Sequence, residues 1–159
     1  MRRILLNLAV AVPVALTVAI CGLQRPAQAA DTSPPVPKDT ELQKAKDQIQ
    51  KKSWADAATT LEAYTRVHET SADGFNLLGY SYRNLKRYDE SLVAYKRALT
   101  LDPKHRGAHE YIGIAYIQMG QPAKAREHLD ALNSICFFSC EEYRDLKKAL
   151  EAADKTLAQ

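Results

Sequence analysis

The sequence predicts an all-α fold built from repeated helix pairs, and three observations carry this prediction. Residues 41–159 contain only two prolines, Pro103 and Pro122, and apolar residues recur there at helical spacing. A pattern of large and small residues around Leu78 and Gly79 returns after a step of 34 residues. Because one helix pair cannot bury its apolar face alone, we expect neighbouring pairs to stack and the last pair to need a cap.

Residues 1–30 are predicted to be a secretory signal peptide. Two arginines stand near the start, residues 4–23 are largely apolar, and Ala27 and Ala29 form an A-x-A cleavage pattern. We therefore expect export to the periplasm, with cleavage after position 29 or 30. No stable membrane insertion is expected once this segment has been removed.

A retained membrane anchor and a lipoprotein anchored at Cys21 are the alternatives. The apolar stretch is interrupted by Asn7 and Pro13, whereas a full span needs about 20 apolar residues. Ile20 precedes Cys21, and lipoprotein processing requires a small residue at that position. Both observations favour a cleaved signal peptide.

The formal net charge of +3 belongs to this N-terminal segment. Arg2, Arg3 and Arg25 lie within it and no acidic residue does, so basic and acidic side chains balance in the remaining chain. Nucleic-acid binding depends on neutralising phosphates with Lys and Arg. We therefore expect no nucleic-acid partner.

Residues 31–40 (D-T-S-P-P-V-P-K-D-T) follow as a proline-rich segment. Proline lacks the backbone N–H that a helix needs and favours extended backbone. We expect a disordered linker here, and three helical repeats over residues 41–139.

Residues 72–105 are the clearest repeat unit. One helical face carries Phe75, Leu78, Gly79 and Tyr82, and a second follows a polar turn at positions 86–87 with Leu92, Tyr95, Ala98 and Leu99. The sequence L-D-P at 101–103 ends the second helix, because the residue before proline is pushed out of helical geometry. The unit is therefore predicted to be a helix, a short turn and a helix.

The pattern recurs on both sides of this unit. Leu78 and Gly79 correspond to Ile112 and Gly113 in residues 106–139, and Trp54 takes the place of Tyr88 in residues 38–71, where the pattern is fainter. Small residues fall where two helices must approach closely, and large residues fall where the gap must be filled. Residues 140–159 then form an amphipathic segment that we expect to be the capping helix, with an apolar side of Tyr143, Leu146, Leu150, Ala153 and Leu157.

These features resemble the tetratricopeptide repeat (TPR) family. The residues that carry the resemblance are Leu78, Gly79, Tyr82, Tyr88, Ala98 and Pro103 in the middle unit, and Ile112, Gly113, Tyr116, Gly120 and Ala125 in the next. The resemblance implies an all-α superhelix of antiparallel helix pairs. Proteins of this family usually bind a peptide or a partner protein in a concave groove lined by the first helix of each unit.

Transferred by position, the resemblance predicts which side chains line the groove. The expected partner-binding residues are Asn76, Tyr80, Arg83, Asn84, Tyr111 and Gln118, with Glu110, Ile114, Lys46 and Gln50 beside them. The family's carboxylate clamp needs two asparagines, and here Tyr80 and Ile114 replace the asparagine of the second turn. We therefore expect no such clamp, while Tyr and Arg are the residue types that most often anchor an interface.

No catalytic or cofactor-binding motif is found in the sequence. There is no H-E-x-x-H, no G-x-S-x-G and no phosphate-binding loop. His105 and His109 are four residues apart, a spacing that can hold a metal ion, but no third ligand is close in sequence. We expect neither an enzyme nor a metal or cofactor site.

Cys136 and Cys140 stand four residues apart around Phe137 and Phe138. A disulfide, two buried free thiols, a soft-metal site such as Cu(I), and a redox-active pair are all open interpretations. Export favours the disulfide, and on a continuous helix two residues four apart lie within disulfide reach. We expect a clip between the third unit and the cap, with both phenylalanines packed beneath it.

The sequence therefore predicts a non-catalytic scaffold in the bacterial envelope that binds a protein or peptide in its groove. The alternative is a redox or soft-metal-handling protein that uses Cys136 and Cys140. A homo-oligomerising module is a further alternative.

Overall fold

The computed structural model describes residues 40–157. It contains seven helices over this range: α1 (Thr40–Gln50), α2 (Trp54–Val67), α3 (Ala72–Asn84), α4 (Tyr88–Leu101), α5 (Arg106–Gln118), α6 (Pro122–Ile135) and α7 (Glu141–Leu157). The predicted signal peptide, and the predicted linker up to residue 39, lie outside the described residues. Thr40 is the first residue of α1, so it does not belong to the linker.

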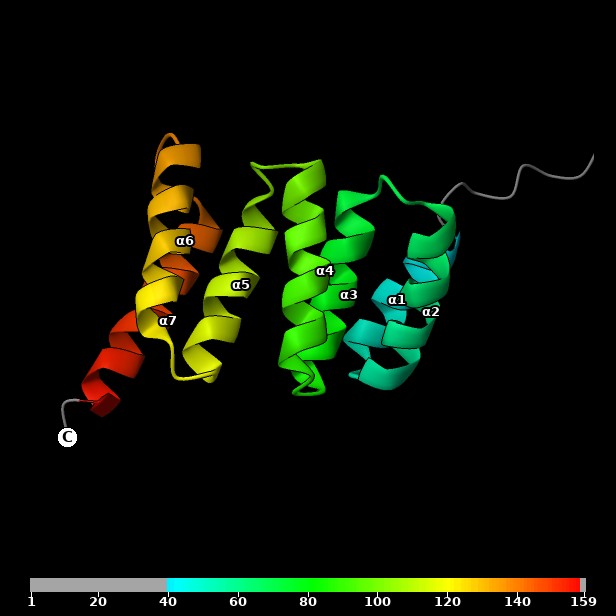
Figure 1. Cartoon of the computed structure of the whole chain (residues 1–159), viewed down its shortest axis with the longest axis horizontal. Coiled ribbons are helices and arrows are strands. Elements are labelled where there is room, and N and C mark those ends of the chain that lie inside the picture. Colours follow the sequence, from blue (N-terminus) through cyan, green and yellow to red (C-terminus); the bar gives the residue numbers. More distant parts are fainter. Residues whose placement is uncertain (1–39, 158–159) are drawn as a thin grey trace, which may run out of the picture. The chain divides into compact units, whose positions relative to one another are not determined.

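The helices are arranged in two layers (Figure 1). Neighbours in sequence pack as pairs, α1 with α2, α3 with α4, and α5 with α6. The odd-numbered helices also contact one another along the stack, whereas no two even-numbered helices do within residues 40–157. The odd-numbered helices are therefore closer together and form the inner, concave layer, and the even-numbered helices form the outer layer. The predicted all-α superhelix of the TPR type is confirmed.

The turn inside each pair has the same backbone geometry in all three repeats. Lys52, Lys86 and Gly120 have φ angles of 58°, 62° and 72°, and they are spaced 34 residues apart. The next residue in each turn donates its backbone N–H to a carbonyl five residues earlier, at 2.9, 2.9 and 2.8 Å. A left-handed residue followed by this long-range bond is a common way to end a helix, because it satisfies a carbonyl of the last turn.

Two glycines lie where inner-layer helices meet large side chains. A β-carbon built on Gly79 would lie 2.6 Å from the ring of Tyr95, and one built on Gly113 would lie 2.5 Å from Leu146. Tyr95 and Leu146 are both fully buried. The expectation that small residues mark close helix contacts is confirmed at these two positions.

Helix α7 closes the stack by packing on α5 and α6. Leu146 and Leu150 are buried there, in a hydrophobic cluster with Ala125 and Leu132 of α6. Glu141 and Glu142 occupy the first turn of α7, where carboxylates favour the helix N-terminus. None of the helices described between residues 40 and 157 is long and apolar enough to cross a membrane.

The loop from α6 to α7 differs from the expectation in two respects. Cys136 and Cys140 do not share a helix, because α6 ends at Ile135 and α7 begins at Glu141. Phe137 and Phe138 do not pack beneath the cysteines, since they are 92% and 87% exposed. The loop is too short to fold its own tip back onto the core. The burial that hydrophobicity alone predicted for Phe137 and Phe138 is therefore wrong.

Candidate functional site

Four predicted groove residues form one cluster on the inner layer. Tyr80 and Arg83 come from α3, and Tyr111 and Gln118 come from α5; we refer to these four as the Arg83 cluster. The rings of Tyr80 and Tyr111 lie 4.9 Å apart between centroids, and the Arg83 guanidinium lies 5.1 and 5.7 Å from them. Arg83 Nη1 also donates to Gln118 Oε1 at 3.4 Å. The cluster therefore ties two neighbouring repeats together at the concave surface.

Helical spacing explains why these side chains meet. Tyr80 and Arg83 are three residues apart, and Tyr111 and Gln118 are seven apart, so each pair lies on one face of its helix. Contact between α3 and α5 brings the two faces together. A guanidinium beside aromatic rings gains from cation–π attraction, which orders a long side chain before any partner arrives.

Aromatic residues extend the cluster in two directions. The ring of Trp54, at the start of α2, lies edge-on to Tyr80 with centroids 5.7 Å apart. Tyr95, from α4, lies 6.2 Å from Tyr111 and is fully buried. Sequence reasoning treated Trp54 as a packing residue in the register of Tyr88 and missed its place beside Tyr80. The interleaving of large rings gives this surface a rigid base.

The environment of Glu110, on α5, raises the pKa of this carboxyl to near neutral pH. Burial raises the pKa of Glu110 to about 7, and the carboxylates of Asp145 and Glu142 on α7 add to this rise. Arg83 acts in the opposite direction. Burial and the neighbouring Glu110 also raise the pKa of Tyr111 to about 12. An acidic edge on α7 therefore borders the Arg83 cluster.

Three buried polar atoms near this surface have no hydrogen-bond partner in the described chain. They are Arg83 Nε, Asn76 Oδ1 and Tyr95 Oη. Asn76 is 7% exposed, and its amide nitrogen would lie 3.3 Å from a β-carbon placed on Gly107, so it sits between α3 and the start of α5. Buried polar groups are normally paired, and the effect of Arg83 on the pKa of Tyr95 indicates that these two side chains lie close together.

The other predicted groove residues are placed differently. Asn84 donates its side-chain amide to the Tyr80 carbonyl at 2.8 Å, a bond within α3. Ile114 packs against the hydrophobic cluster of α6 and α7. Lys46 and Gln50 are exposed on α1. Whether any of the ten residues contacts a partner stays a prediction.

A histidine pair was not foreseen in the sequence. His109 Nδ1 and His128 Nδ1 are 3.0 Å apart, and His109 Nε2 lies 3.1 Å from the Pro103 carbonyl. A carbonyl only accepts, so His109 Nε2 carries a proton and donates it to this oxygen. Burial, helped by His109, lowers the pKa of His128 to about 4. The pair links α5, α6 and the turn before α5, and a separation of 19 residues gave no signal for it.

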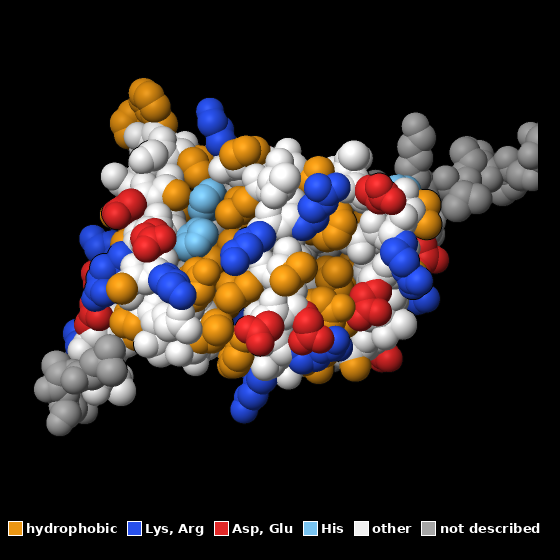
Figure 2. All heavy atoms as spheres, viewed as in Figure 1, with side chains coloured by type: hydrophobic (Ala, Val, Ile, Leu, Met, Phe, Trp, Pro, Cys, Tyr) orange, Lys and Arg blue, Asp and Glu red, His pale blue; other side chains and the backbone are white. Residues whose placement is uncertain are grey.

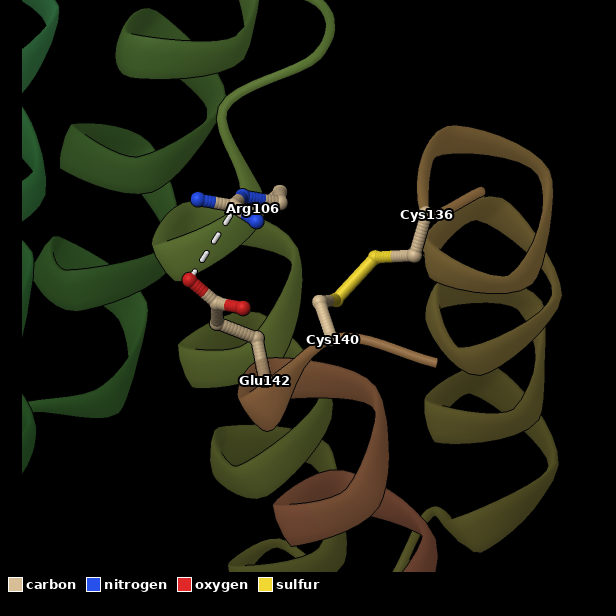
Figure 3. Close-up of a disulfide and its surroundings, with 4 residues drawn as sticks. All are labelled: Arg106, Cys136, Cys140 and Glu142. Carbon is tan, nitrogen blue, oxygen red and sulfur yellow. Dashed lines mark ion pairs between the residues drawn. A yellow bond between two sulfur atoms is a disulfide. The ribbon is translucent and has the colours of Figure 1, made fainter. Parts of the chain in front are cut away.

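Cys136 and Cys140 lie together at the end of the stack and are joined as a disulfide, with Cα atoms 5.6 Å apart (Figure 3). Beside them, Arg106 Nε of α5 lies 3.6 Å from Glu142 Oε1 of α7. The oxidation state of the pair in the isolated protein stays a prediction. Within residues 40–157, no three His, Cys, Asp or Glu side chains are grouped so as to hold a metal ion.

Comparison with known proteins gives a consistent result. Residues 72–105 match the tetratricopeptide repeat family. No curated protein sequence matches the chain. The fold resembles the Yersinia enterocolitica type III secretion translocator chaperone SycD, with a TM-score of 0.68 at 18% identity over 76% of this chain and 86% of that one.

Two similar structures are complexes. SycD with a peptide of the translocator YopD has a TM-score of 0.65 at 19% identity, over 75% of this chain and 93% of that one. The TPR2B domain of yeast Sti1 in a complex with pHsp70 has a TM-score of 0.67 at 19% identity, over 73% and 94%. Identities this low show likeness of fold alone. The chain thus has the all-α superhelical fold of tetratricopeptide repeat proteins, with residues 72–105 as the unit that matches the family.

Proposed function

We propose that this protein is a non-catalytic scaffold that binds an extended segment of a partner protein on its inner layer. The observation that carries the proposal is the Arg83 cluster, in which two tyrosines and an arginine from neighbouring repeats converge on the concave side. Tyrosine and arginine supply large contact area and several hydrogen-bond donors, and they dominate interface hot spots.

Similar structures support this proposal at the level of the fold. SycD and Sti1 are seen with a peptide of YopD and with pHsp70. The present chain has the fold that these proteins use, and its own inner layer differs in sequence. The partner segment therefore has to be identified by selecting peptides on this protein itself.

The test is peptide selection followed by binding measurements. A displayed peptide library is selected on the full chain, and the affinity of the best peptide is measured for the wild type, Tyr80→Ala and Arg83→Lys. We expect each change to weaken binding by about tenfold or more, because loss of a hot-spot contact typically costs about 2 kcal/mol or more. Arg83→Lys keeps the charge but loses the planar group that stacks on both rings.

Arg87→Ala is the matched control. Arg87 also lies over a tyrosine, with its guanidinium 4.4 Å from the Tyr82 ring, but it belongs to the turn before α4. Peptide affinity should be unchanged in this variant. An equal loss of peptide affinity in Arg87→Ala and Arg83→Lys would contradict the proposal. Unchanged affinity in Tyr80→Ala would contradict it as well.

We also propose that the protein acts in the bacterial envelope. The support is the sequence of residues 1–30, with its arginines, apolar stretch and A-x-A pattern. The intact mass of the protein recovered from a periplasmic fraction should correspond to a chain that begins at position 30 or 31. Recovery of the full-length chain from the membrane or the cytoplasm would contradict it.

A redox or soft-metal role for Cys136 and Cys140 is the alternative function. Thiolates, not a disulfide, bind soft metals and attack other disulfides. Native mass spectrometry with and without added copper separates the two functions. Copper carried by the wild type and lost when both cysteines are changed to serine would favour the alternative.

A further inference from the structure

Helix α7 is held to the stack by one side only. It packs on α5 and α6 and on no other helix of residues 40–157, with Leu146 and Leu150 buried in the contact. In Figure 2, acidic and basic side chains are interspersed over the end of the stack where α6 and α7 lie. An element at the end of a stack has fewer neighbours than the inner repeats, so its local opening costs less free energy than unfolding of the whole chain.

A line of residues along α5 faces α7. Arg106, Glu110 and Gly113 are spaced four and three residues apart, so they lie on one side of the helix. Arg106 Nε lies 3.6 Å from Glu142 Oε1 of α7 (Figure 3). A β-carbon on Gly113 would lie 2.5 Å from Leu146, also of α7. Both neighbours of Glu110 in this line therefore contact α7, which places the half-buried Glu110 carboxyl in the α5–α7 interface.

The side of α7 that meets Glu110 is acidic. Burial raises the pKa of Glu110 to about 7, and the neighbouring carboxylates of Asp145, Glu142 and Glu141 raise it as well. We call these four residues the carboxylate cluster; one of its members comes from α5 and three come from the first two turns of α7. Like charges across an interface repel, so the cluster opposes ionisation of Glu110 as long as α7 is in place.

The other charged and titratable groups around α5 do not cancel this effect. Arg83 of α3 lowers the pKa of Glu110, but by less than burial, Asp145 and Glu142 raise it. On α6, His128 meets His109, and burial lowers the pKa of His128 to about 4. On α4, Tyr95 is directed to Tyr111. Glu110 is therefore the group at the α5–α7 interface that changes its charge near neutral pH.

We propose that α7 is a pH-sensitive cap, which is closed on α5 while Glu110 carries a proton and opens locally as Glu110 ionises. Opening gives the ionised carboxyl access to water and takes it away from the three carboxylates of α7. It also uncovers the side of α5 that borders the Arg83 cluster. The disulfide between Cys136 and Cys140 ties the start of α7 to the end of α6, so the opened helix stays attached and closes again.

The direction of the pH effect follows from proton binding. In the open state Glu110 titrates near the ordinary glutamate pKa of about 4.3, whereas in the closed state its pKa is raised to about 7. Between these two values the closed state binds more protons than the open state. The contribution of Glu110 to closure is therefore complete below this window and is lost as pH rises through it.

Hydrogen–deuterium exchange of the full chain between pH 5 and pH 8 tests the cap. Protection factors, which correct for the pH dependence of the chemical exchange rate, report the opening equilibrium of each helix. In the wild type the opening constant of α7 should rise by about fivefold or more across this range. Because Glu110 is only half-buried and water screens its charge, the rise stays below tenfold per pH unit. Protection of α3 and α4 should change less.

Three variants assign the effect to Glu110. In Glu110→Gln the side chain cannot ionise, so α7 should have the same opening constant at pH 5 and pH 8. Asp145→Asn removes one member of the carboxylate cluster, so the dependence on pH should remain but weaken. Glu127→Gln is the matched control, since Glu127 is an exposed glutamate of α6 outside the cluster, and it should keep the full dependence of the wild type.

Three results would overturn the proposal. The first is a wild-type α7 whose opening constant is the same at pH 5 and pH 8. The second is a rise that persists in Glu110→Gln. The third is protection of α7 that changes in parallel with that of α3 and α4, because this would show unfolding of the whole chain instead of opening of the cap. No partner is needed for the measurement, so its outcome is independent of the peptide-binding proposal.

Discussion

Glu110 is the residue whose environment makes the clearest prediction about pH. Burial raises its pKa to about 7 in the folded protein, whereas an unfolded glutamate titrates near about 4.3. Between these values the folded state binds more protons than the unfolded state, so ionisation of Glu110 lowers stability as pH rises. His128 acts in the opposite direction over an overlapping window, because its pKa falls to about 4.

Replacing Glu110 therefore isolates one of two opposing contributions. In Glu110→Gln we expect the free energy of unfolding to rise with pH between about 4.5 and 7 more steeply than in the wild type. Urea unfolding at several pH values, followed by circular dichroism, measures the difference. A constant offset between the two proteins at all pH values would show that Glu110 titrates normally.

Gly113 gives a second prediction at the scale of a single residue. A methyl group at this position would meet Leu146 at 2.5 Å, and overpacking a core costs about 1–3 kcal/mol. Gly113→Ala should therefore destabilise the protein despite the better helix propensity of alanine. Leu146→Ala alone should cost about 2–5 kcal/mol, as a buried large-to-small change.

The double variant decides whether the two residues act through their contact. With Leu146 shortened to alanine the methyl group at position 113 has space, so the double variant should be more stable than the sum of the single effects predicts. Strict additivity in chemical denaturation would mean that the helices α5 and α7 do not meet as closely as described.

At the scale of one element, the turn inside each helix pair places a residue with left-handed backbone geometry at the same position of every repeat. Lys86 pays a steric cost there that Gly120 avoids, since left-handed geometry costs a non-glycine residue about 1–2 kcal/mol. After the extra chain entropy of glycine is subtracted, Lys86→Gly should raise the free energy of unfolding by about 0.5–1 kcal/mol. Gly120→Lys should lower it by a similar amount, and changes of the same sign in both variants would contradict the account.

The loop between α6 and α7 gives a second prediction at this scale. A disulfide between Cys136 and Cys140 closes a five-residue loop, and the chain-entropy account gives such a loop about 2 kcal/mol. Reduction should therefore cost less than Leu146→Ala, which removes the anchor of the cap. Thermal unfolding with and without reductant compares them. A protein that unfolds on reduction but tolerates Leu146→Ala would reverse the assigned roles.

The sequence predicted the elements better than their contacts. Helix pairs at 34-residue spacing were predictable, because periodicity and turn residues are local properties. The polar turn at positions 86–87 was predicted, but the left-handed backbone of Lys52 and Lys86 was not, since only Gly120 is a residue type that prefers the left-handed region. The pairing of His109 with His128 was not predictable, because it depends on how α5 and α6 pack against each other.

In the candidate site, too, repeat position was predictable from the sequence and contacts between helices were not. Tyr80, Arg83, Tyr111 and Gln118 were placed on one surface by repeat register, and they do meet there. Trp54 was assigned to packing, because register does not reveal that its ring reaches Tyr80 across α2 and α3. Hydrophobicity predicted burial for Phe137 and Phe138, but a short loop at the end of the stack has no core to bury them in.

At the scale of the whole molecule, stacking gives the inner and outer layers different properties. The inner helices contact one another, and the outer helices are spread apart. Hydrogen bonds across the stack add to this, as when Tyr82 donates to Glu62 of the preceding repeat at 2.6 Å. The inner layer is therefore the continuous surface on which an extended peptide can contact several repeats at once.

The central claim is that a partner segment lies along this inner layer over the Arg83 cluster. Amide chemical shifts of the full chain, titrated with the selected peptide, test it most directly. The account predicts that the largest shifts fall on residues 76–84 of α3 and 110–118 of α5, while α4 and α6 change little. Shifts confined to the outer helices or to the loop around Phe137 would contradict it.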